Sequence, residues 1–131
     1  MEAIELIVTS PAFKQEGDIP IKYTCDGEGI NPPLQIENLP NETVTLAIIV
    51  EDPDAPNGIF DHWLVWSIDP VPTIAENRII GINGKNSAGK NGYSGPCPPN
   101  GVHRYMFFVF ALDSDIDLPT GGSRARPAGD A

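Results

Sequence analysis

The sequence predicts a single domain that is almost entirely β, with long and elaborate loops. Fourteen prolines and thirteen glycines are spread between short apolar runs, which argues against long helices. No window keeps helical apolar spacing over three turns, and the apolar runs have the lengths of strands. With 131 residues, the chain is long enough to bury the core of one domain.

Seven apolar runs are expected to form the strands, at residues 4–8, 19–24, 34–37, 44–51, 62–68, 78–82 and 102–112. Three of these runs are apolar at nearly every position, as expected of central strands that are covered on both faces. They are residues 44–50, 63–68 and 106–112.

Side-chain alternation assigns the polar residues of two central strands to faces. It places His62 with Leu64, and it places His103 with Tyr105. After residue 118, no apolar side chain is larger than Ala or Pro. We therefore expect a domain over residues 1–118 and a disordered tail over residues 119–131.

The net charge of −10 and the pI of about 4.3 make nucleic acid and anionic membrane surfaces poor partners. No run approaches the roughly 20 apolar residues of a membrane span, and the first residues lack a signal-peptide pattern. We therefore expect a cytoplasmic protein without integral membrane association. In that compartment Cys25 and Cys97 should be reduced, although the sequence leaves their pairing open.

A candidate site lies where three of the central strands begin or end. Asp52 and Asp54 leave one strand where His62 enters the next, and a Gly/Pro-rich loop leads into His103 and Tyr105. Imidazole, phenol and the backbone N–H groups of residues 92–95 are mainly donors, which suits phosphate, carboxylate or a similar anion. We expect at least one aspartate to keep a histidine protonated or to fix its tautomer.

Other interpretations of these residues stay open. The Asp52 segment is also a rigid proline turn, and aspartates with histidines are able to hold a metal, although no known ligand spacing is present. Ser94 or Cys97 paired with His103 would be a nucleophile, but no nucleophile elbow surrounds them. Residues 84–91, GKNSAGKN, follow a phosphate-loop pattern until Asn91 and lack a following helix, so we reject that function.

Two long motifs give the chain a specific resemblance. DPDAP followed by HWLVW, and then GYSGPCPPNGVHRYMFFVFALD, resemble the phosphatidylethanolamine-binding protein family, in particular its prokaryotic, Raf-kinase-inhibitor-like branch. The upstream YTCDGEGINPPL is similar to the same branch. The resemblance covers residues 4–124.

The resemblance implies an antiparallel β-sandwich with a small anion pocket at one sheet end. It extends the site to a full set of ligand-binding residues: Asp52, Asp54, Pro56, His62, Gly95, Pro96, His103 and Tyr105. It implies a non-enzymatic protein without cofactor or metal, which binds a phosphate-like headgroup and inhibits or modulates a kinase or protease. The alternative is a metal-dependent or acid/base hydrolase that uses Asp52, His62 and His103.

The C-terminal end departs from the family pattern. The family continues after the LDLP-like segment with a helix and a last strand, whereas this sequence ends in ARPAGDA. Loss of that cover would expose apolar area at roughly 25 cal/mol per Å². We therefore expect a marginally stable monomer or a homo-oligomer that covers the exposed patch.

Overall fold

The computed structural model describes residues 3–13, 19–25, 27–55, 58–78, 80–96, 105–114 and 121. Within these residues it contains seven strands and one short 3-10 helix: β1 (Ala3–Thr9), η1 (Ile21–Tyr23), β2 (Leu34–Glu37), β3 (Thr45–Asp52), β4 (Phe60–Ile68), β5 (Thr73–Ile74), β6 (Ile82–Asn83) and β7 (Met106–Leu112). No helix in this part of the chain has the length and apolarity needed to cross a membrane. The predicted all-β fold is confirmed.

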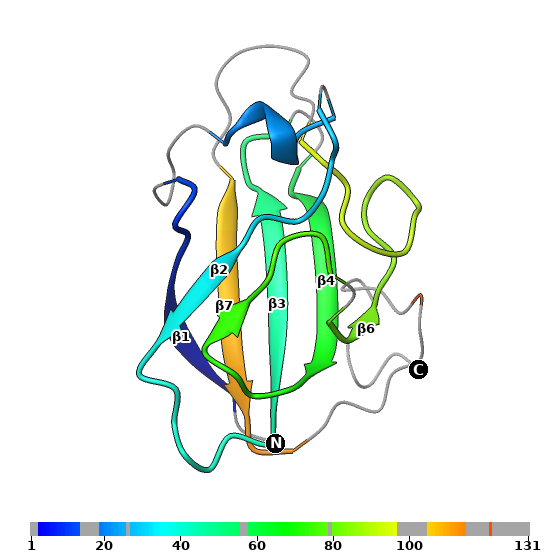
Figure 1. The fold of residues 1–131 in the computed structure, drawn as a ribbon. Helices are drawn as coiled ribbons and strands as arrows, with labels where there is room; N and C mark the ends of the chain where they lie inside the picture. The colour runs from blue at the N-terminus through cyan, green and yellow to red at the C-terminus, as the bar shows by residue number, and fades with distance from the viewer. Residues whose placement is uncertain are drawn as a thin grey trace.

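The strands pair only in antiparallel fashion, in the order β5-β2-β1-β7-β3-β4-β6. β1 pairs with two strands: its first residues pair with β7, and its last residues pair with β2. The β1 strand therefore passes from one sheet layer to the other. Figure 1 shows the result, with β2 and β5 lying across the layer formed by β7, β3 and β4.

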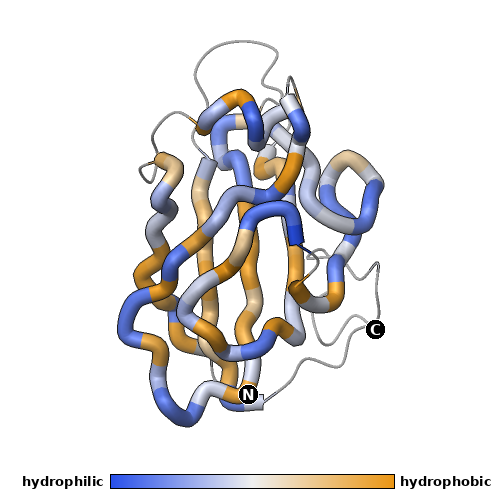
Figure 2. The backbone as a smooth tube through the Cα atoms, viewed as in Figure 1, coloured by the Kyte–Doolittle hydropathy of each residue, from blue (hydrophilic) through white to orange (hydrophobic). Residues whose placement is uncertain are grey.

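The core lies between these two layers. β3 and β7 alternate between fully and partly buried side chains, so the near-continuous apolar runs supply one dry face and one half-buried face. Ile48, Val65 and Val109 are at most 1% exposed and pack in the same cluster as Leu34 and Ile74 of the other layer. Figure 2 shows apolar residues along the central strands and polar ones in the connecting loops.

Two predicted strands are wrong in whole or in part. Residues 19–24 were expected to form a strand, but residues 21–23 form η1 after Pro20, and no described residue of that run is in a strand. Residues 78–82 were expected to form one strand, yet among the described residues of this run only Ile82 lies in one, namely β6. Ile79 lies outside the described residues. β5 was missed, because two residues are too few to show an alternating pattern.

The predicted face of His62 is also wrong. The β3–β4 register shifts between Val50 and Glu51, where Trp63 pairs with Val50 but Asp61 pairs with Glu51. His62 is the additional residue of this β-bulge, so simple alternation fails there. Trp63 belongs to the core cluster, and Leu64 pairs with Ile49 instead, on the other face. Tyr105, Phe107 and Val109, at alternate positions, all belong to the core cluster. The predicted shared face of His103 and Tyr105 is not tested, since His103 lies outside the described residues.

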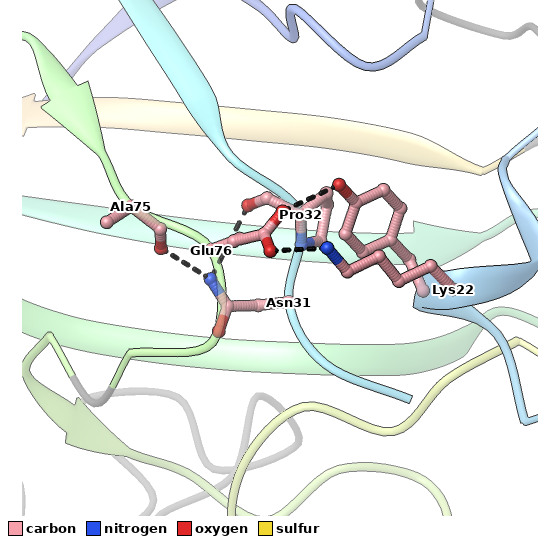
Figure 3. A network of polar contacts seen from close by, with 6 residues as sticks. Lys22, Asn31, Pro32, Ala75 and Glu76 are labelled. Carbon is pink, nitrogen blue, oxygen red and sulfur yellow. Dashed lines mark hydrogen bonds and ion pairs between the residues drawn. The ribbon is translucent and has the colours of Figure 1, made fainter. Parts of the chain in front are cut away.

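A polar network fixes η1 over one end of the sheet. Glu76 accepts hydrogen bonds from Lys22 Nζ at 2.6 Å and from the Tyr23 hydroxyl at 2.8 Å. These bonds lower the pKa of Glu76, mainly through Lys22. The Asn31 amide donates to the Ala75 carbonyl at 3.0 Å in the same network, as Figure 3 shows. The segment after β5 therefore fixes both η1 and the residues that precede β2.

The predicted division at residue 118 stays a prediction. Residues 115–120 and 122–131 lie outside the described part of the chain. Gly121 is described, and its backbone N–H donates to the Asn83 carbonyl at 3.0 Å.

Candidate functional site

Three of the predicted site residues meet at one end of the sheet. Asp52 is the last residue of β3, His62 is the third residue of β4, and Tyr105 directly precedes β7. In the antiparallel sheet, Glu51 of β3 lies opposite Asp61 of β4 and Met106 of β7. Each site residue is the chain neighbour of one of these three, so all three site residues lie at the same end of the sheet. All three are buried.

His62 is held by a backbone carbonyl. Its Nδ1 lies 2.9 Å from the Ser94 oxygen, and the Ser94 N–H donates to the His62 carbonyl at 2.8 Å. A carbonyl oxygen only accepts, so Nδ1 must carry a proton. In the neutral ring Nε2 is then an acceptor, and it becomes a donor only in the imidazolium form. His62 therefore suits an anion only when it is doubly protonated.

Tyr105 has a buried hydroxyl with no hydrogen-bond partner among the described residues. The residue is 9% exposed, and its ring meets the His62 ring edge on, with centroids 5.6 Å apart. Burial, and secondly the charge of Asp52, raise the pKa of Tyr105 to about 12. The hydroxyl thus stays protonated at neutral pH and is available as a donor to a ligand.

The two aspartates differ in their surroundings. Asp52 is 3% exposed, and its carboxylate accepts the Asp54 backbone N–H at 2.8 Å. The Asp54 side chain is exposed. This contact is an Asx turn, in which the Asp52 side chain bonds a nearby backbone N–H, as expected of a rigid turn at this segment. The negative charge of Asp52 acts on Tyr105, where it contributes to the raised pKa of the hydroxyl.

Gly95 and Pro96 lie against the residues that follow η1. The Cys25 N–H donates to the Pro96 carbonyl at 3.3 Å, and the Tyr93 hydroxyl donates to the Tyr23 carbonyl at 2.8 Å. A Cβ atom on Gly95 would lie 2.7 Å from the Thr24 carbonyl carbon, closer than side chains come to backbone. Glycine is therefore required for this close approach of the two segments. Figure 1 shows both segments at the end of the sheet where β3 ends and β4 begins.

Two predicted site residues, Pro56 and His103, lie outside the described residues, as does Cys97. The described residues contain no group of three or more His, Cys, Asp and Glu side chains that could hold a metal ion. The hydrolase alternative depends on His103, so the described geometry does not test it. Ser94, which was weighed as a nucleophile, contacts His62 through backbone atoms.

The loop that resembles a phosphate loop has another architecture. The residues after it, 92–96, form no helix, and its amide groups are engaged within the protein: Ala88 and Lys90 donate to Asn86 Oδ1, and Ser87 donates to the Asp61 carbonyl. These N–H groups are therefore not available to cradle a phosphate.

A cavity of about 180 Å³ lies at the other end of β7, next to Leu112. Its lining includes the acidic residues Glu42 and Asp113 and no basic residue. This acidic lining makes the cavity unsuitable for an anion.

Cys25 is disulfide-bonded. The chain contains two cysteines, and the other one, Cys97, lies outside the described residues. The sequence left cysteine pairing open and favoured reduced cysteines only for a cytoplasmic protein; in this structure Cys25 is not reduced. Disulfides are rare in cytosolic proteins, so the bonded Cys25 does not support the predicted cytoplasmic location. That location stays a prediction.

Residues 9–128 match the family model described as phosphatidylethanolamine-binding protein. The chain is 46% identical over 121 residues to a UPF0098 protein of Archaeoglobus fulgidus, a match that covers 86% of this chain and 42% of that protein. It is 45% identical over 121 residues to a UPF0098 protein of Methanothermobacter thermautotrophicus, covering 86% of this chain and 80% of the relative.

Two crystal structures have a similar fold. A protein of Chlamydia trachomatis described as a phosphatidylethanolamine-binding protein homologue matches with a TM-score of 0.85 and 42% identity, over 90% of this chain and 82% of that one. E. coli YbcL, described as a member of the mammalian PEBP family, matches with a TM-score of 0.81 and 29% identity, over 93% and 86% of the two chains.

Proposed function

The chain belongs to the phosphatidylethanolamine-binding protein family, and we propose that it binds a small anion at the sheet end formed by Asp52, His62 and Tyr105. The anion is a phosphate or a phospho-headgroup. We also propose as ligand-binding residues Asp54, Pro56, Gly95, Pro96 and His103, as the family resemblance implies. The protein acts by binding and not by catalysis, and it modulates a partner protein, with a kinase or a protease as the proposed partner class.

The observation that carries this proposal is the Tyr105 hydroxyl. A buried donor without a partner costs a folded protein roughly 1–3 kcal/mol. Here the hydroxyl lies beside the His62 ring, and the raised pKa of Tyr105 keeps its proton in place. An anionic oxygen bound between the two rings would accept from the hydroxyl and from a protonated imidazole. Ligand binding would thus satisfy a group that the described residues leave unsatisfied.

Asp52 has a supporting role in this proposal. A carboxylate repels an anion directly, but it stabilises a neighbouring imidazolium. The Ser94 carbonyl accepts the Nδ1 proton of His62, so this carbonyl, and not an aspartate, sets the tautomer of the neutral ring. The role left for Asp52 is electrostatic, and replacement by asparagine would weaken anion binding by making protonation of His62 less favourable.

A thermal shift experiment tests the proposal. Phosphate and O-phosphorylethanolamine should raise the unfolding temperature of the wild type in a saturable way, because a ligand that binds only the folded state stabilises it. The shift should disappear in His62→Ala. Equal shifts in the wild type and the variant would show that the anions act on the solvent or elsewhere on the protein, and the proposed site would be wrong.

A further inference from the structure

One loop beside the proposed pocket has a charge opposite to that of the whole protein. Residues 84–92, the lysine loop, contain Lys85 and Lys90 and no acidic residue, whereas the chain carries a net charge of −10. Both lysines are exposed. The ion pair among the described residues joins Lys22 to Glu76 and involves neither of them. Figure 1 shows the loop projecting beside β4, away from the layer of central strands.

The lysine loop is rigidly built around one buried asparagine. Asn86 is 4% exposed, and its Oδ1 accepts the backbone N–H groups of Ala88 at 2.9 Å and Lys90 at 3.1 Å. Its Nδ2 donates to the Gly92 carbonyl at 2.9 Å. The backbone closes the same turn, because the Asn86 N–H donates to the Lys90 carbonyl at 2.8 Å. The two lysines are therefore presented from a preorganised backbone, which reduces the entropy that binding would cost.

The loop is also fixed next to the pocket. Ser87 and Asp61 exchange two hydrogen bonds, from the Ser87 N–H at 2.9 Å and to the Ser87 hydroxyl at 2.8 Å. Asp61 directly precedes His62 in β4. The chain that leaves the loop reaches Ser94, whose carbonyl holds His62. The loop and the pocket thus share a rigid connection on both sides of His62.

We propose that the lysine loop is a second contact surface, which binds an acidic protein segment adjoining the anion held in the pocket. This inference rests on the proposed anion pocket and specifies its ligand as part of a polypeptide with flanking negative charges. Positive side chains set in a negative surface select partners by charge complementarity and orient them. A membrane fits less well, because two lysines fall short of the polybasic cluster that binds an anionic lipid surface.

The test compares a small probe with a peptide probe on the full chain. The probes are O-phosphorylethanolamine, a peptide with phosphoserine flanked by glutamates, and the same peptide with glutamines in place of the glutamates. The double variant Lys85→Gln/Lys90→Gln should bind O-phosphorylethanolamine as the wild type does. Its affinity for the glutamate peptide should fall about fivefold at low salt, since exposed ion pairs are individually weak. The difference should shrink at high salt.

A charge-matched control separates the loop from the net charge. Arg78 is an exposed cation outside the loop, so Arg78→Gln changes the net charge as much as either single lysine variant does. It should leave the affinity for both peptides unchanged. An equal loss in Arg78→Gln and in each lysine variant would overturn the inference in favour of a general charge effect.

The remaining outcomes separate a failure of this inference from a failure of the proposed anion binding on which it rests. If the wild type binds O-phosphorylethanolamine but does not prefer the glutamate peptide, the pocket stands and the second contact surface is wrong. If the wild type binds none of the probes, the proposed pocket fails and the inference fails with it. Lysine-dependent binding to phosphatidylserine vesicles, without any preference for the glutamate peptide, would identify a lipid surface as the partner and overturn the inference.

Discussion

The edge of the Tyr105 ring meets the His62 ring at an interplanar angle of 75°, with the centroids 5.6 Å apart. The two residues come from segments more than forty positions apart, and β3 lies between them in the sheet. His62 is placed by a β-bulge, and Tyr105 by the first inward position before β7. The proposed pocket therefore depends on the pairing of three strands.

Replacement of Tyr105 by phenylalanine should separate stability from binding. The variant removes a buried hydroxyl that has no partner among the described residues, so the free energy of unfolding should stay the same or rise by about 1 kcal/mol. Affinity for phosphate should fall about tenfold, because a donor is lost. Chemical denaturation and calorimetric titration check the two effects. A strongly destabilised variant would show that the hydroxyl has a structural partner.

Anion binding should weaken as the pH rises. Nδ1 of His62 already carries a proton, so the ring offers the anion a second donor only as imidazolium. Affinity should fall over the pH range in which the ring loses that proton, because Nε2 of the neutral ring is an acceptor and offers the anion no hydrogen bond. Sulfate is the suitable ligand, since its own charge is constant there. The raised pKa of Tyr105, about 12, keeps its hydroxyl protonated throughout.

A control identifies the source of that pH dependence. His62→Gln has no titrating ring, so its residual sulfate affinity should vary less with pH than that of the wild type. An identical slope in His62→Gln would assign the titration to another group and contradict the role given to His62.

Gly95→Ala should disturb the pocket through the backbone. The new Cβ would lie 2.8 Å from the Cys25 nitrogen and 2.7 Å from the Thr24 carbonyl carbon, so the two segments must separate. We expect a loss of roughly 2 kcal/mol in stability and a clear loss of phosphate affinity. Gly89→Ala is the matched control, because Gly89 has a positive φ of 82° but open space around it. Gly89→Ala should lower the free energy of unfolding by about 1 kcal/mol and leave phosphate binding unchanged.

Removal of the Cys25 disulfide should destabilise the fold and loosen the Gly95 segment. Cys25→Ser should lose about 2–4 kcal/mol under oxidising conditions, as is typical of native disulfides. Cys97→Ser should lose the same amount, and the double variant no more, because the chain has two cysteines. The melting temperature of the wild type should also fall in dithiothreitol. An unchanged melting temperature would mean that the disulfide is absent or without energetic consequence.

The sequence was sufficient to predict the centre of the fold. Most residues of β3, β4 and β7 are apolar, as is typical of central strands that are covered on both faces. The short elements were harder to predict from the sequence, because η1 contains the strand-like sequence IKY and β5 has only two residues. Their conformations are set by contacts distant in sequence, such as that between Tyr23 and Glu76.

The candidate site was predictable in its side chains and not in its backbone. Asp52, His62 and Tyr105 were expected at one sheet end because each stands at the end of an apolar run, and the structure brings them together. The face of His62 was missed, since a bulge depends on pairing with β3. The Ser94 carbonyl was missed as well, because a backbone acceptor leaves no signal in the residue type.

The central claim, an anion site at His62 and Tyr105, is tested most directly by NMR. Phosphate and O-phosphorylethanolamine would be titrated into the folded protein while the ring signals of both residues are followed. Saturable shifts at both rings, absent at Tyr93 and abolished in His62→Ala, are the predicted result. A well-folded sample whose His62 and Tyr105 signals do not move at millimolar anion concentrations would contradict the claim.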